Sequence, residues 1–119
     1  MFKQKISGNH GFDFFSETLS QFIVFGEAKY VSNSNGHGRA LEQIERFIME
    51  ERDTSDLNDI DRFVSDSSLN NHTKNDKAFA CDFSATSIKS ETLIDNILNN
   101  DNFNKIKHHR EIILIAVNI

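Results

Sequence analysis

Apolar residues in this chain recur with two different periods, and together these predict alternating strands and helices. Apolar or β-forming runs and period-two alternation predict strands, whereas apolar residues three or four positions apart predict amphipathic helices. The resulting order, β-β-α-α-β-α-β, predicts an α/β domain. The expected strands are 11–16, 22–31, 78–84 and 111–118. The expected helices are 38–52 and 56–65, with a third that begins at Ser90 and continues or restarts through 99–107.

The segments between these elements are polar. Residues 32–38 contain Ser, Asn and Gly without an apolar side chain, which marks a clear break in the chain. Residues 65–77 are rich in Asn, Asp and Ser, and we expect them to form an exposed and mobile loop. The last run, 112–117, is apolar without interruption, which is typical of a central strand covered on both faces. If it lay at a sheet edge instead, it would invite pairing with another copy.

Two charged residues stand on the strand expected at 22–31. Residues two apart in a strand share a face, so Glu27 and Lys29 project from the side that also carries Ile23 and Phe25. A carboxylate and an ammonium thus follow an apolar run on a face suited to burial. Asp13, on the neighbouring strand of the predicted hairpin, could meet Glu27 if the strand register allows it.

An acid on one strand and Glu-x-Lys on the next suit metal-dependent phosphodiester hydrolysis. Two carboxylates supply the hard oxygen ligands that Mg²⁺ or Mn²⁺ prefers, and water fills the remaining positions. A lysine beside the cation can orient an attacking water or stabilise developing charge. The simpler alternative is a solvated ion pair between Glu27 and Lys29, which is common on strands.

The stretches Gly11-Phe12-Asp13 and Phe25-Gly26-Glu27-Ala28-Lys29 resemble the PD-(D/E)xK nuclease superfamily. The resemblance implies a restriction-endonuclease-like fold with a mixed central sheet flanked by helices, here as a minimal or truncated core. It also implies that Asp13 and Glu27 are metal ligands, that Lys29 is the catalytic lysine, and that Ala28 offers its backbone carbonyl to the metal. Some branches place a glutamine on the following helix, and Gln43 occupies a suitable position.

Residues 11–48 also resemble, more loosely, the nuclease subunit of Hachiman-type antiphage systems, which implies a role in phage defence or a mobile element. Candidate contacts to nucleic acid are Arg39, Arg46 and His37. The two arginines could bind the DNA backbone or pair with glutamates of their own helix. Family members usually open with a helix, whereas ten residues precede Gly11 here, so we expect another subunit to complete the sheet or core.

Composition limits the remaining choices. The 119 residues suffice for one domain, 1–119, and 11 phenylalanines supply bulky core material. The chain has no apolar run long enough to cross a membrane, and its single cysteine, Cys81, is expected to be a buried structural thiol, so we expect a cytoplasmic protein. A net charge of −5 argues against a strongly basic nucleic-acid wrapper. The sequence contains no EF-hand, phosphate-binding glycine loop or zinc spacing.

A non-catalytic function is the alternative. The chain could be a small α/β association domain, either a homodimer or one subunit of a larger complex. The apolar run 112–117 is the feature that favours this reading. Close placement of the Asp13 and Glu27 carboxylates with Lys29 beside them would favour the metal site.

Overall fold

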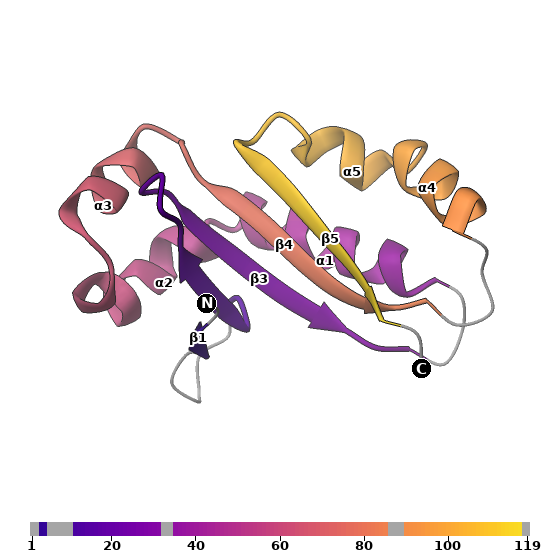
Figure 1. Cartoon of the computed structure of the whole chain (residues 1–119), viewed down its shortest axis with the longest axis horizontal. Coiled ribbons are helices and arrows are strands. Elements are labelled where there is room, and N and C mark those ends of the chain that lie inside the picture. Colours follow the sequence, from indigo (N-terminus) through magenta and orange to yellow (C-terminus); the bar gives the residue numbers. More distant parts are fainter. Residues whose placement is uncertain (1–2, 5–10, 32–34, 86–89, 118–119) are drawn as a thin grey trace.

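The computed structural model describes residues 3–4, 11–31, 35–85 and 90–117, which form a small α/β domain with a mixed five-stranded sheet (Figure 1). The strands follow one another across the sheet in chain order. Antiparallel pairing joins the first three strands, and parallel pairing joins the last three. The strands are β1 (Lys3–Gln4), β2 (Phe14–Glu17), β3 (Ile23–Lys29), β4 (Ala78–Ser84) and β5 (Glu111–Val117).

Helices form the two crossovers between the parallel strands. The helices are α1 (Gly36–Met49), α2 (Arg52–Ile60), the 3₁₀ helix η1 (Asp61–Phe63), α3 (Asp66–Thr73), α4 (Ser90–Leu98) and α5 (Asp101–Ile106). Both crossovers move one strand over in the same direction. Crossovers of the usual right hand then place their helices on the same face of the sheet. Helix α1 accordingly lies behind β3 and β4, and α5 packs beside α1 (Figure 1).

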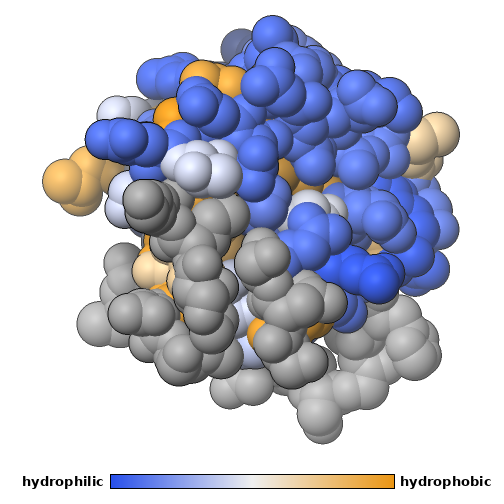
Figure 2. All heavy atoms as spheres, turned by 90° about the vertical axis from the view of Figure 1, so that its right-hand side faces the viewer, coloured by the Kyte–Doolittle hydropathy of each residue, from blue (hydrophilic) through white to orange (hydrophobic). Residues whose placement is uncertain are grey.

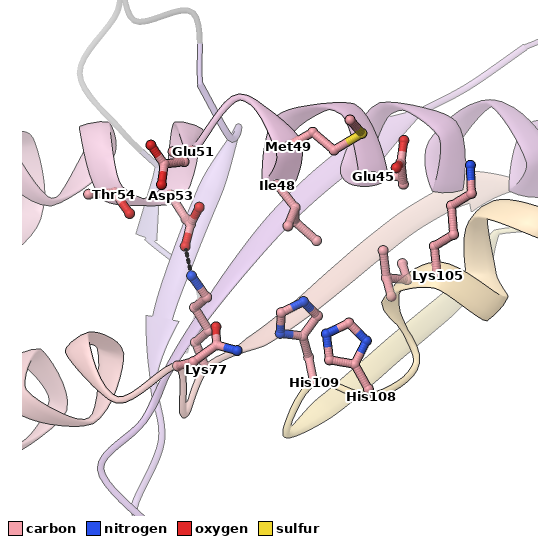
Figure 3. Close-up of a pocket in the computed structure, with 12 residues that line it drawn as sticks. Glu45, Ile48, Met49, Glu51, Asp53, Thr54, Lys77, Lys105, His108 and His109 are labelled. Atoms are coloured by element: carbon pink, nitrogen blue, oxygen red, sulfur yellow. Dashed lines mark hydrogen bonds and ion pairs between the residues drawn. The ribbon is translucent and has the colours of Figure 1, made fainter.

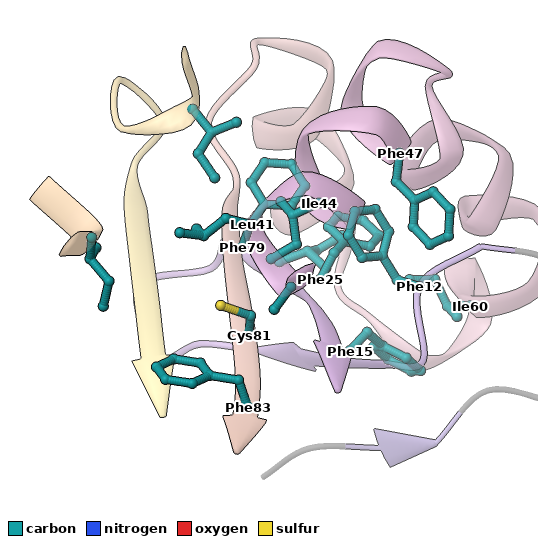
Figure 4. Packing of buried hydrophobic residues seen from close by; sticks show 14 residues of the cluster. Phe12, Phe15, Phe25, Leu41, Ile44, Phe47, Ile60, Phe79, Cys81 and Phe83 are labelled. Carbon is teal, nitrogen blue, oxygen red and sulfur yellow. The ribbon is translucent and has the colours of Figure 1, made fainter. Parts of the chain in front are cut away.

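The main core lies between this helical layer and the sheet, and phenylalanine rings dominate it (Figure 4). The ring of Phe12 lies 5.6 Å from that of Phe25, 5.5 Å from that of Phe79 and 5.3 Å from that of Phe47, centroid to centroid. Burial of each such ring contributes about 1.5–3 kcal/mol. A smaller apolar cluster on the opposite face is built from residues in or beside the strands: Phe22, Val24, Ala78 and Ala80, with Phe14 and Ile113 against them.

A close contact fixes where α1 begins over the sheet. A Cβ atom at Gly36 would lie 2.4 Å from the carbonyl oxygen of Ser84, so only glycine allows the helix to start against the end of β4. The hydroxyl of Ser84 also accepts from the amide of Val31 and donates to its carbonyl, at 2.9 Å each. Helix α1 therefore starts at the carboxyl end of β4 and runs antiparallel to that strand.

The structure corrects two expectations about the second half of the chain. Residues 66–73, expected to be loop, form α3, whose first turn is capped by Ser65 accepting from the amide of Ser68 at 3.2 Å. The buried face of α3 carries Ser68 and His72, so no apolar period marks it. The strand β5, expected at the centre of the sheet, is an edge strand of the described sheet.

The start of the second helix also differs from expectation. Helix α2 begins at Arg52 instead of residue 56, after Glu51 breaks the chain with a positive φ of 55°. Its buried positions include Asp53 and Asp56, which an apolar pattern does not reveal.

None of the described helices has the length and apolar character needed to span a membrane. Seen from the end where β3 and β4 finish, the coloured surface is mainly hydrophilic (Figure 2).

Candidate functional site

Asp13 lies directly before β2, beside the middle of β3. Its backbone amide donates to the carbonyl of Gly26 at 2.9 Å. Its exposed side chain turns along the same strand, and Oδ2 accepts from the amide of Ala28 at 3.1 Å. The carboxylate is thus placed at the peptide between Glu27 and Ala28, which brings the predicted acid to the predicted Glu-x-Lys strand.

Neighbouring residues explain why Asp13 occupies this position. The amide of Phe12 donates to the buried carboxylate of Asp56 on α2 at 3.0 Å, and the Phe12 ring is fully buried. Phe12 and Phe15 both enter the main core although they are three positions apart. Regular strand alternation would send them to opposite faces, so the alternation breaks at Asp13 and Phe14. Asp56 holds the backbone at Phe12, the residue next to Asp13, and the sequence pattern did not reveal this contact.

Glu27 is a buried acid on the helical face of the sheet. Only 6% of its surface is exposed, and it shares the face of Phe25. It pairs with Cys81 across β3 and β4. Burial, together with the charges of Asp82 and Glu27, raises the pKa of the Cys81 thiol to about 12. The expected burial of Cys81 is confirmed.

Lys29 follows on the same face of β3. It is half-buried and pairs in register with Phe83, at the carboxyl end of the sheet. The strand period places its side chain on the side of Glu27, one step closer to the strand end. Asp82, a third acid in the neighbourhood, belongs to the opposite face of β4 and accepts from the Tyr30 hydroxyl at 3.1 Å.

Gln43 lies on α1 at the level of Glu27. Gly36 lies against Ser84, and Gln43 is roughly 10 Å along the helix from Gly36. Cys81, the partner of Glu27, is likewise roughly 10 Å along β4 from Ser84. The side chain is half-buried, and its Oε1 accepts from Nη2 of Arg46 at 2.7 Å. This hydrogen bond runs along the helix surface, so Gln43 points only partly inward.

The candidate nucleic-acid contacts divide into exposed and buried residues. Arg39 and Arg46 are exposed on α1. His37, expected in a loop, lies in the first turn of α1 with 5% of its surface exposed, edge-on to the Phe83 ring. Burial lowers the pKa of His37. The expected loop position was wrong because α1 begins two residues earlier, at Gly36.

A hard divalent cation beside Asp13 would have few protein ligands. Among the described residues, no three His, Cys, Asp or Glu side chains are grouped so that they could hold a metal. A cation here would therefore use the two carboxylates of Asp13 and Glu27, the Ala28 carbonyl and water. Ala28 directs its amide toward Asp13, and in an extended strand the carbonyl of the same residue points to the same side.

A second polar constellation lies at the other end of the parallel strands, around a cavity of about 360 Å³ (Figure 3). The buried carboxylate of Asp53 accepts from Nζ of Lys77 and lies 2.8 Å from Nε2 of His72. His109 lines the same cavity, and burial lowers its pKa to about 4, with smaller effects from His108 and Lys77. These partners are far apart in sequence, and no motif links them.

Comparison with known proteins identifies no relative of this chain. No family model matches the chain, and no match is found among curated proteins or solved structures. The chemistry and the positions of Asp13, Glu27, Lys29 and Gln43 therefore carry any functional proposal.

Proposed function

We propose that the chain is a nuclease-like domain that hydrolyses nucleic-acid phosphodiesters with the help of Mg²⁺ or Mn²⁺. The observation that carries the proposal is the contact between the Asp13 carboxylate and the Ala28 amide. It supports the proposal because a second acid lies against the backbone of β3, the strand that carries Glu27 and Lys29. An ion pair between Glu27 and Lys29 alone would not require Asp13 at this position.

The bound cation would supply Lewis-acid stabilisation of the charge that develops on the phosphate. The protein's own residues would do the remaining work. Asp13 and Glu27 bind and orient the cation, and burial of Glu27 limits its rearrangement. Lys29 lies beyond the two acids toward the strand end, where its ammonium can orient water and stabilise the phosphate. Gln43, at the level of Glu27, would hold the exposed guanidinium of Arg46 in position through its hydrogen bond to that group.

The substrate surface would extend over the exposed side of α1. Arg39 and Arg46 lie on this helix and would contact the DNA backbone without reading sequence. With a net charge of −5, the chain would bind DNA weakly and in a salt-dependent manner. The loose resemblance to antiphage nuclease subunits favours a cytoplasmic role in phage defence or a mobile element.

Cleavage of supercoiled plasmid and of single-stranded DNA tests this proposal. The assay compares wild type with Asp13→Asn, Glu27→Gln and Lys29→Ala, each with Mg²⁺, Mn²⁺ or chelator. We expect cation-dependent cleavage by wild type and at least a 100-fold loss in each variant, as is typical when a group that stabilises the transition state is removed. Gln43→Ala should lose less activity.

A matched control uses Asp95→Asn on α4, which removes an exposed carboxylate far from β3. This variant should cleave like wild type. Equal loss in Asp95→Asn, or cleavage that persists in Glu27→Gln, would contradict the proposal.

A further inference from the structure

The strand β5 has an unprotected edge. In the described sheet it pairs only with β4, so its other side carries backbone amides and carbonyls without a strand partner. Natural edge strands are usually short, charged, bulged or broken by proline. Residues 112–117 contain no charged residue and no proline, and Ile115 is 37% exposed. The edge therefore lacks the usual features that prevent association.

Helix α4 places a second apolar surface beside this edge. A groove of about 320 Å³ lies between α4 and α5 on one side and the helical face of β4 and β5 on the other. Its lining includes Ile94 and Leu98, each 56% exposed, and Leu114 of β5. Ile97 is the one residue of α4 that is buried. A strand added to β5 would bring its side chains toward this groove.

We propose that a second copy of the chain occupies this edge, with β5 pairing antiparallel to β5 about a two-fold axis at Leu114. In this register Ile112 of one copy faces Ala116 of the other, and Ile113 faces Ile115. Each of these pairs is apolar. Because the side-chain period of a strand is two, residues 112, 114 and 116 of both copies lie on the helical face. Symmetry then lets α4 of each copy approach the added strand.

Charge also suits this register. Glu111 is the only charged residue of β5, and it would face Val117 of the other copy. The two Glu111 side chains would be roughly 20 Å apart, given a strand rise of about 3.4 Å per residue. That separation exceeds the Debye length of about 8 Å in physiological salt. Like charges therefore do not oppose this pairing.

The size of the surface sets the expected affinity. The seven residues of β5 span roughly 23 Å, and α4 adds an apolar strip beside them. A contact made by one strand edge and one helix belongs with small, transient interfaces, because a standard stable interface takes roughly 800 Å² from each partner. We therefore expect a reversible dimer with a dissociation constant on the order of micromolar. The inference is independent of the proposed nuclease activity.

Sedimentation velocity over a range of concentrations tests this inference on the full chain. Wild type should approach twice the 13.6 kDa chain mass as concentration rises. Ile115→Lys should remain monomeric, because a charge blocks the edge, and Ile94→Lys should weaken dimerisation at least tenfold. Met49→Lys, which changes a residue that is 73% exposed on α1, should dimerise like wild type. Far-ultraviolet circular dichroism would verify that each variant is folded.

Cross-linking tests the register. Ile113→Cys and Ile115→Cys chains carrying different tags should form a mixed disulfide on oxidation, in preference to either like pair, because these positions face each other. Cys81 is buried and will not interfere. A monomeric wild type at all concentrations would overturn the inference, as would a dimer that persists in folded Ile115→Lys or an absence of mixed disulfide. A monomer that binds some other extended peptide would also overturn it.

Discussion

The carboxylate of Asp13 accepts a hydrogen bond from the backbone amide of Ala28, 15 positions later in the chain. The backbone amide of Asp13 also donates to the carbonyl of Gly26, so Asp13 is joined to β3 through both its backbone and its side chain. This double attachment gives the acid a fixed place beside Glu27. It also gives Asp13 a structural role that is separable from metal binding.

That separation leads to a prediction for two substitutions at Asp13. Asp13→Ala removes the acceptor of the Ala28 amide, whereas Asp13→Asn keeps an oxygen there and removes only the charge. We expect the Ala variant to be less stable than the Asn variant by about 0.5–1.5 kcal/mol in metal-free urea unfolding. The Asn variant should equal or exceed wild type, since repulsion with Glu27 is relieved. Equal unfolding midpoints for the two variants would contradict the assigned hydrogen bond.

Gly26 and Phe14 give a second prediction. A Cβ atom at Gly26 would lie 1.8 Å from Cε2 of the Phe14 ring, so the ring must move if alanine is introduced. Gly26→Ala should cost about 1–3 kcal/mol. In a double-mutant cycle with Phe14→Ala, the Gly26→Ala cost should fall by at least about 1 kcal/mol. Additive effects in urea unfolding would show that the ring does not cover Gly26.

His109 predicts a pH dependence of stability. Burial lowers its folded pKa to about 4 from the ordinary 6.5, so the unfolded chain binds the proton more readily. Stability from this group is fully present above pH 6.5 and is lost as the pH falls toward 4. At about 1.4 kcal/mol per pKa unit, the loss approaches 3 kcal/mol. The lowered pKa of His37 acts in the same direction.

The test is urea unfolding of wild type and His109→Gln at pH 7.0, 5.5 and 4.5. Glutamine cannot take up the proton, so the variant should lose distinctly less stability over this range. Asp53, whose pKa is lowered by the hydrogen bonds of His72 and Lys77 against the effect of burial, loses its contribution only at more acidic pH. Identical slopes in the two proteins would show that the His109 pKa is not lowered.

The fold was predicted most closely where apolar periodicity was strong. The strand expected at 78–84 is confirmed as β4, with Phe79, Cys81 and Phe83 on the helical face. The α/β class and the mixed sheet are confirmed as well. Helix α3 was missed because its buried positions carry polar side chains. The edge position of β5 was missed because the composition of a strand does not identify its neighbours.

The candidate site was predicted only in outline. The short spacing between the two strands predicted a hairpin, and β2 does pair with β3. The period of a strand predicted a shared face for Glu27 and Lys29, which both lie on β3. The Asp13 contact depends on broken alternation between Phe12 and Phe15, which no simple period contains. The roles of Asp53 and Asp56 depend on partners that are distant in sequence. Catalysis by this site stays a prediction.

Calorimetric titration with Mn²⁺ tests the central claim most directly, because it asks whether Asp13 and Glu27 hold a divalent cation. Wild type should bind about one ion per chain, in line with a single two-carboxylate site. Lys29→Ala should bind it about as well, since an ammonium is not a ligand, whereas Asp13→Asn and Glu27→Gln should each weaken binding at least tenfold. Wild type that binds no Mn²⁺, or a folded Glu27→Gln that binds it unchanged, would contradict the account.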